Sequence, residues 1–288
     1  MNWLSTFFKG MAMGAADVVP GVSGGTVALI TGIYATLINS IRAFDLELLR
    51  LLLKGQVRAC WLRVNGNFLI ALVAGIGCSL FSLAKLISLA LEQYPTQIYA
   101  FFIGLILASA VVLLRDIQQW RSALVVSLLA GVLVMLGISE LRPVEITPSP
   151  LILFGAGAIA ICAMILPGIS GSFLLLMMGV YPFVLEAVHQ LQWLTLAIFA
   201  GGCAVGLLLF VRLLSWLLER YRDLLMSFLI GVLFASVKVL WPWTADPSAG
   251  PPAVVFPAEL AMDFASFTVG MLLVIGVNFW AGRKPQEA

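Results

Sequence analysis

The stretch PGVSGG at residues 20–25 interrupts an apolar part of the chain, and the near-copy PGISGS follows at residues 167–172. The likeness extends without a gap over 19–34 and 166–181, where seven of sixteen positions are identical. Because proline and glycine break helices, the sequence predicts two broken apolar helices. Paired interruptions in corresponding halves of a membrane protein point to a transport site.

The composition is that of a polytopic membrane protein. Of the 288 residues, 62% are hydrophobic and only 10% are charged, with a mean hydropathy of +1.08. A soluble domain has about 25% charged residues. The net charge is only +2 and the cations are scattered at segment ends, so a role in nucleic-acid binding has no support. The four cysteines lack metal-ligand spacing, and we expect no disulfide and no metal site.

Further matches between the two halves indicate a duplication. A shift of 127 residues aligns 98–109 with 225–236, and a shift of 139 pairs Gly131 with Gly270. We predict an all-α membrane protein of two repeats, each made of a re-entrant helical hairpin and three transmembrane helices. The first repeat is 1–139, with its hairpin at about 3–41 and spans at 66–92, 96–114 and 122–139; the second is 150–288, with its hairpin at about 150–188 and spans at 193–218, 224–241 and 262–281.

The distribution of lysine and arginine predicts the orientation of these segments. The connection 42–65 contains five cations, 219–223 contains two, and Arg283 and Lys284 follow the last span. The positive-inside rule places these segments and both termini in the cytoplasm. Each half then crosses the membrane an odd number of times, so the second repeat is inverted. If each Pro-Gly pair merely kinked one span, the repeats would be parallel and 219–223 would lie outside, against the charge pattern.

The basic connection 42–65 has two interpretations. Arg50, Lys54 and Arg58 recur every four residues among leucines, a pattern that suits a helix lying on the anionic cytoplasmic leaflet. A solvated basic loop is the other interpretation.

The two Ser-Gly tips predict an anion site. At each break the serine can cap the next half-helix, and the first amides of that half-helix would face a cavity. Helix N-termini attract anions through such free amides and the helix dipole. A packing kink is the simpler alternative for either copy alone. The predicted hairpin breaks are Pro20, Gly21, Pro167 and Gly168, and the predicted phosphate-binding tips are Ser23, Gly24, Gly25, Thr26, Ser170, Gly171 and Ser172.

Three charged residues inside apolar segments are further candidates. Lys85 and Arg212 occupy matched positions in the two halves, where each could meet an anion from its own leaflet or snorkel to the headgroups. Asp17 precedes the first break and could carry a coupling proton or cap a half-helix. A nucleophile with a base, a metal-ligand cluster and a nucleotide-binding motif are all missing from the sequence, so we expect neither an enzyme nor a cofactor.

The segments GAADVVPGVSGGT at 14–26 and ILPGISGS at 165–172 resemble those of the bacterial polyprenyl-phosphate transporter family, PopT. The resemblance extends over nearly the whole chain in length and segment order. It implies a flippase of the bacterial cytoplasmic membrane that returns undecaprenyl phosphate to the cytoplasmic leaflet for peptidoglycan and other envelope polymers. The second copy differs from the first in having Ser172 for Gly25 and Met164 for Asp17.

Together these observations lead to a hypothesis in which the two tips cradle the lipid phosphate, while Lys85 and Arg212 attract it from opposite leaflets. Asp17 couples the cycle to a proton or cation. A transporter of a small soluble anion is the main alternative; a lipid phosphatase or a non-transporting scaffold is less well supported.

Overall fold

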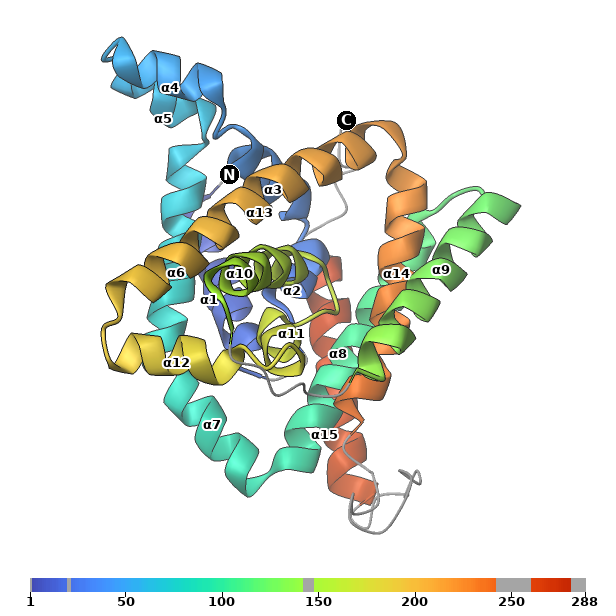
Figure 1. The fold of residues 1–288 in the computed structure, drawn as a ribbon. Coiled ribbons are helices and arrows are strands. Elements are labelled where there is room, and N and C mark those ends of the chain that lie inside the picture. The colour runs from blue at the N-terminus through green and yellow to red at the C-terminus, as the bar shows by residue number, and fades with distance from the viewer. Residues whose placement is uncertain (1, 20–21, 142–147, 242–259, 281–288) are drawn as a thin grey trace.

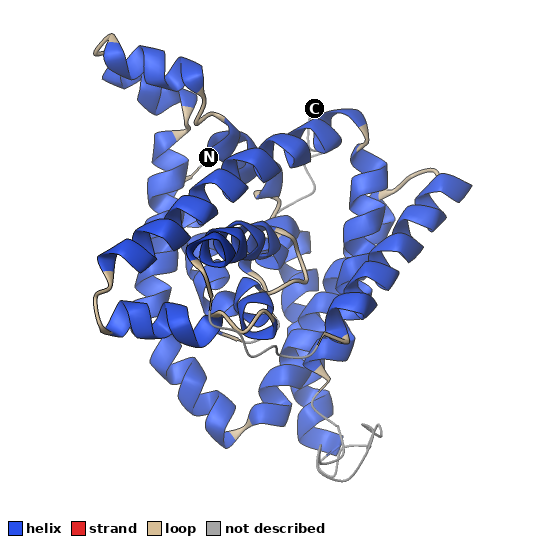
Figure 2. Cartoon of the chain, viewed as in Figure 1, coloured by secondary structure: helices blue, strands red, loops and turns tan. Residues whose placement is uncertain are grey.

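The computed structural model describes residues 2–19, 22–141, 148–241 and 260–280, and every regular element in these ranges is an α-helix (Figure 2). The predicted class, an all-α membrane protein, is confirmed. Four helices are long and apolar enough to cross a bilayer on their own, and three bent helix pairs pass the same test when each is taken as one segment. The four are α8 (Pro95–Asp116), α9 (Ser122–Ser139), α13 (Trp193–Arg220) and α14 (Arg222–Leu240).

A three-helix unit occurs twice with the same internal spacing. Adding 147 to the bounds of the first three helices gives the bounds of the second three. In both units a turn with a glycine of positive φ, 71° at Gly32 and 68° at Gly179, separates the second and third helices. These two helices bend by 115° in the first unit and 107° in the second. The units are α1 (Trp3–Val18), α2 (Gly24–Ile30) and α3 (Tyr34–Arg42), and α10 (Pro150–Ile165), α11 (Gly171–Met177) and α12 (Tyr181–His189).

The segment predicted as one span over 66–92 is divided in the structure. It forms α6 (Gly66–Ser82) and α7 (Ala84–Gln93), whereas its counterpart α13 is continuous. The hydroxyl of Ser82 donates a hydrogen bond to the carbonyl of Cys78, and back-bonding of this kind bends helices. Figure 1 shows α7 leaving the line of α6.

The basic connection forms a short helical hairpin, α4 (Leu46–Leu53) and α5 (Val57–Arg63), that projects from the rest of the chain (Figure 1). Asp45 begins it by accepting a hydrogen bond from the Leu48 amide at 2.9 Å and by pairing with Arg63 at 2.6 Å. The Arg63 guanidinium holds the pKa of the Asp45 carboxyl below its usual range. The segment is therefore neither one helix nor a loop, and its contact with a leaflet stays a prediction.

Four further helices form two packed pairs, and each pair has one helix from the first half of the chain and one from the second. α8 packs against α15 (Leu260–Trp280), and α14 packs against α9. Close contact depends on glycine: a Cβ at Gly270 would overlap the carbonyl oxygen of Phe101, and a Cβ at Gly131 would overlap that of Phe228. The two glycines are paired by the sequence shift of 139 residues, and the two phenylalanines are paired by the shift of 127. α8 and α14 run in opposite directions (Figure 1), which agrees with inverted repeats. The orientation of each repeat relative to a membrane stays a prediction.

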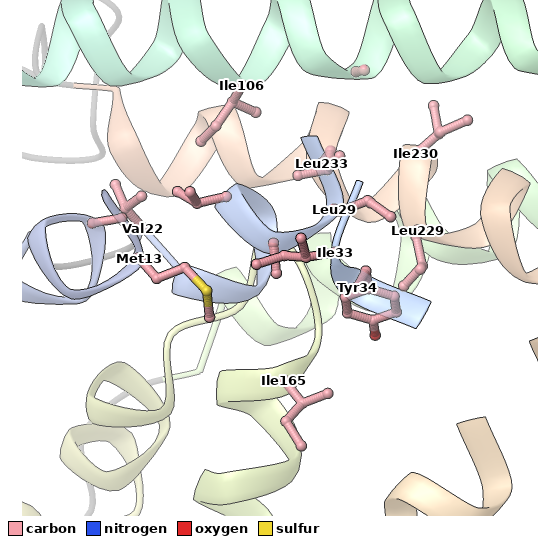
Figure 3. Packing of buried hydrophobic residues seen from close by; sticks show 14 of the residues in the cluster. Met13, Val22, Leu29, Ile33, Tyr34, Ile106, Ile165, Leu229, Ile230 and Leu233 are labelled. Carbon is pink, nitrogen blue, oxygen red and sulfur yellow. The ribbon is translucent and has the colours of Figure 1, made fainter. Parts of the chain in front are cut away.

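The main apolar core joins the first hairpin to the central helices. Leu29 and Ile33 of the first hairpin lie in one buried cluster with Ile106 of α8 and with Ile230 and Leu233 of α14 (Figure 3). This core holds α2 in place, so its N-terminus has a defined position in the interior.

We expect Gly270→Ala to lower the stability of the protein by about 1–3 kcal/mol, because the added methyl group forces α15 away from α8. Thermal unfolding in detergent measures the change. Gly276→Ala on the same helix is the matched control, since a Cβ there meets no atom within 4 Å. Equal melting temperatures for the two variants would contradict the packing.

Candidate functional site

The two helix breaks contact each other directly. The buried hydroxyl of Ser23 lies 3.0 Å from the carbonyl oxygen of Met164 and 3.2 Å from that of Leu166, at the end of α10. The hydroxyl of Thr26 accepts a hydrogen bond from the amide of Gly168 at 3.0 Å. The first tip therefore satisfies backbone groups that the second break leaves without helical partners.

The predicted break residues are only partly described. Pro20 and Gly21 lie outside the described residues. Pro167 and Gly168 lie between α10 and α11, where Gly168 has a φ of +83°. This is a left-handed conformation that favours glycine.

The amides of the first tip already have partners. The Gly24 amide donates to the Asp17 carboxylate at 2.6 Å, and the Gly25 amide donates to the Ser23 hydroxyl at 3.1 Å. The Thr26 amide donates to the Ser23 carbonyl at 2.9 Å. The expectation that these three amides are free for a ligand is wrong for this conformation. Asp17 caps a half-helix, which was one of its two predicted roles.

The second tip is differently arranged because Met164 occupies the position of Asp17. The hydroxyls of Ser170 and Ser172 lie 2.9 Å apart, and the Phe173 amide makes only a long, 3.5 Å contact with Ser170. Within the described residues, the amides of Gly171 and Ser172 have no hydrogen-bond acceptor. Donors are therefore available at the second tip and engaged at the first.

A cavity of about 200 Å³ lies where the tips meet. Pockets that bury a whole drug-sized ligand are larger, about 300–1,000 Å³, so this space suits a head group and not a long chain. Its polar lining combines one carboxylate with three hydroxyls, and its walls are apolar side chains of α10, α11 and the first half of α13. The lining residues are Asp17, Val22, Ser23, Ala160, Ile161, Met164, Ile169, Ser170, Gly171, Ser172, Leu175, Phe199 and Cys203.

Lys85 and Arg212 do not reach this cavity. Lys85 is exposed on α7, and Arg212 is exposed on α13. Neither side chain lines the space between the tips. The structure therefore brings Asp17 and both serine tips together and leaves the two matched cations at the protein surface.

Several polar contacts of the hairpins have no signal in the sequence. The Lys9 ammonium donates to the Thr31 carbonyl at the end of α2 at 2.8 Å. Arg42 of α3 pairs with Glu219 and donates to Ser215 at 2.7 Å, both on α13. Arg42 and Glu219 are 177 positions apart, so only the fold shows that they are partners.

Two broken helices that meet at a cavity containing a carboxylate and three hydroxyls, in a chain of apolar helices, form an arrangement found in membrane transporters. The undecaprenyl phosphate translocase-like family matches residues 13–249. A polyprenyl-phosphate transporter of Vibrio cholerae is 50% identical over 84% of this chain and 79% of its own length. A polyprenyl-phosphate transporter of Staphylococcus aureus is 30% identical over 99% of this chain and 98% of its own. The protein belongs to the undecaprenyl phosphate translocase-like family. No solved structure matches the chain.

The two tips should respond differently to loss of their hydroxyls. We expect Ser23→Ala and Thr26→Val each to destabilise the protein by about 1–3 kcal/mol, because each leaves buried backbone groups unpaired. Ser172→Ala serves as the matched control at the second tip, where its hydroxyl bonds only that of Ser170, and should change stability by less than about 1 kcal/mol. Thermal unfolding in detergent distinguishes the variants, and equal losses at both tips would contradict the assignment.

Proposed function

We propose that this protein is a flippase that moves undecaprenyl phosphate from the outer to the cytoplasmic leaflet of a bacterial cytoplasmic membrane, returning the carrier lipid to cell-envelope synthesis. The observation that carries the proposal is the head-group-sized cavity between the two breaks, with unpaired donors on one side of it. The prenyl chain can stay in the bilayer, so the protein has to enclose only the phosphate. The proposed activity is translocation without chemical change.

The second tip is the phosphate subsite in the present conformation. Ser170, Gly171 and Ser172 line the cavity. The amides of Gly171 and Ser172 are unpaired within the described residues, and the hydroxyls of Ser170 and Ser172 bond each other, which leaves one of the two hydroxyl hydrogens free to donate. Phosphate oxygens are acceptors, and donors in a water-poor cavity bind them more strongly than donors in water do.

The first tip takes the same role in the opposite conformation. Of its donors, the Gly24 amide is bound to Asp17 and the Ser23 hydroxyl to the second break, while the Gly25 and Thr26 amides are bound to Ser23. The Ser23 hydroxyl and the Gly24 amide become available when the contacts with the second break and with Asp17 separate. The two tips then hold the phosphate in turn, each from its own side of the membrane.

Asp17 couples this cycle to protons. Its carboxyl group lines the cavity beside Ser170 and Ser172. An ionised carboxylate repels a phosphate held in the same small cavity, whereas a protonated carboxyl group can donate a hydrogen bond to the phosphate. Entry of the phosphate therefore requires a proton on Asp17.

Lys85 and Arg212 act earlier, at the surface. Both side chains are exposed, on α7 and α13 respectively, which suits attraction of an anionic head group before it enters. Transport of a small soluble anion through the same cavity is the second candidate, and the assay below distinguishes it.

We expect the purified protein in liposomes to move a fluorescent or radiolabelled polyprenyl phosphate between leaflets. Ser170→Ala combined with Ser172→Ala should reduce the rate at least about tenfold, the cost of two charge-assisted hydrogen bonds. Ser122→Ala, on an exposed helix start, is the matched control. Uptake of inorganic phosphate without lipid movement would favour the soluble-anion transporter, and unchanged flipping by the double variant would reject the site.

The role of Asp17 predicts the pH response of flipping. Raising the pH on the side from which the lipid enters should slow the unmodified protein, because fewer Asp17 carboxyls are protonated. Asp17→Asn should remove this dependence, since the amide is neutral at every pH and still donates. Asp17→Met, which copies the second half, should remove both the dependence and the cap of α2. A pH profile of Asp17→Asn that matches the unmodified protein would contradict proton coupling.

A further inference from the structure

A polar clasp joins the first hairpin to α13 at one end of the molecule. Arg42 pairs with Glu219 and donates to the buried hydroxyl of Ser215 at 2.7 Å. Ser215 in turn lies 3.2 Å from the amide oxygen of Asn39. These contacts lock α3 against the second half of α13. The charge pattern of the sequence predicts that this end is cytoplasmic.

The internal repeat specifies a matching set of residues at the other end. The offset of 147 that relates α3 to α12 takes Arg42 to His189. The offset of 127 that relates the start of α8 to the start of α14 takes Glu92 to Glu219. A cationic residue on the hairpin and a carboxylate on the facing helix therefore recur together: Arg42 with Glu219 in one set, and His189 with Glu92 in the other.

The second set is separated in this conformation. α12 packs against α11 and α13, and within the described residues it makes no comparable contact with α6 or α7. Glu186 of α12 accepts a hydrogen bond from Gln190, next to its own helix, at 2.8 Å. α7 presents exposed leucines, with Leu86 62% and Leu89 44% accessible.

The helices that would carry the second clasp have the means to move. α13 is continuous, and α3 is held against it. The counterpart of α13 in the first half is divided at Leu83 into α6 and α7, and the Ser82 hydroxyl bonds back to the Cys78 carbonyl just before this division. α7 packs only lightly on α1 and α8, so it can swing about this break as a hinge while α6 stays packed on α1.

We propose that α7 and α12 close on each other through His189 and Glu92 in the conformation opposite to the present one, and that this second clasp alternates with the Arg42–Glu219 clasp. Closure at one end then accompanies opening at the other. The inference rests on the proposed transport function, for which it supplies the two gates. In agreement, the cavity between the tips takes its α13 lining, Phe199 and Cys203, from the first half of that helix, away from the closed clasp.

The other charges on the helices of the second clasp are few. Glu186 lies on α12, Lys85 and Glu92 lie on α7, and the first half of α13 carries no ionic side chain. Arginine keeps its charge at every pH, so His189→Arg would give this end the permanent cation that Arg42 provides at the other end.

Distance measurements between spin labels test this proposal without requiring substrate. The labels are placed at Leu86→Cys and Leu185→Cys, both exposed positions, after the four native cysteines are replaced by alanine. In nanodiscs, Glu219→Gln should open the present clasp and raise the population that has a short α7–α12 distance. The expected increase is about two- to fivefold, because loss of one exposed ion pair changes the ratio of two populations by about that factor. Adding His189→Gln should reverse the increase. Glu140→Gln, which breaks the exposed pair with Lys238 elsewhere, is the matched control.

His189→Arg gives a second arm. It should raise the short-distance population, because arginine always carries the charge that pairs with Glu92. An unchanged distance distribution in Glu219→Gln, or an increase that survives His189→Gln, would overturn the proposal. Flipping is measured in parallel on the same labelled protein. Distance changes without flipping would reject the proposed function and leave the clasp standing, whereas flipping without distance changes would reject the clasp alone.

Discussion

The structure depends on one requirement, that backbone groups freed by a helix break inside an apolar environment must find partners within the protein. Each half of this chain contains such a break. The first break pairs its own amides with Asp17 and Ser23, whereas the second depends on the first for partners. Ser23 bonds the carbonyls at the end of α10, and Thr26 bonds the amide of Gly168. The two breaks are therefore held together, and the cavity exists because they meet.

The same contact makes the two halves unequal. The three helices of each hairpin have matching bounds, yet Asp17 caps α2 whereas Met164 leaves the corresponding amides at α11 unpaired. At the periphery, α3 is bound to α13, whereas α12 has no comparable contact with α7 within the described residues. A repeated sequence in two different environments is what a transporter with two alternating conformations requires.

Much of the site could be predicted because proline, glycine and serine act locally. Their pattern at 167–172 predicts a broken helix and a capping serine, and the structure has both, with the amides of Gly171 and Ser172 unpaired within the described residues. The pattern at 20–25 predicts the same, but Asp17 occupies the amide of Gly24. A carboxylate seven residues earlier could be identified as a possible cap, although its reach depends on how the chain folds back through the break. Lys85 and Arg212 are matched in sequence, and yet the bend at Leu83 and the exposed face of α13 keep them away from the cavity.

The sequence by itself determined the class of protein, the repeat and the position of both breaks, because hydropathy and helix-breaking residues act over short distances along the chain. The tertiary structure alone decided which groups at the breaks are free, since that depends on partners that folding brings close, such as Asp17 for the Gly24 amide and the Met164 carbonyl for Ser23. It also decided which cation is bound to which carboxylate. Arg42 and Glu219 lie on helices far apart in sequence, and only packing of α3 on α13 brings them together.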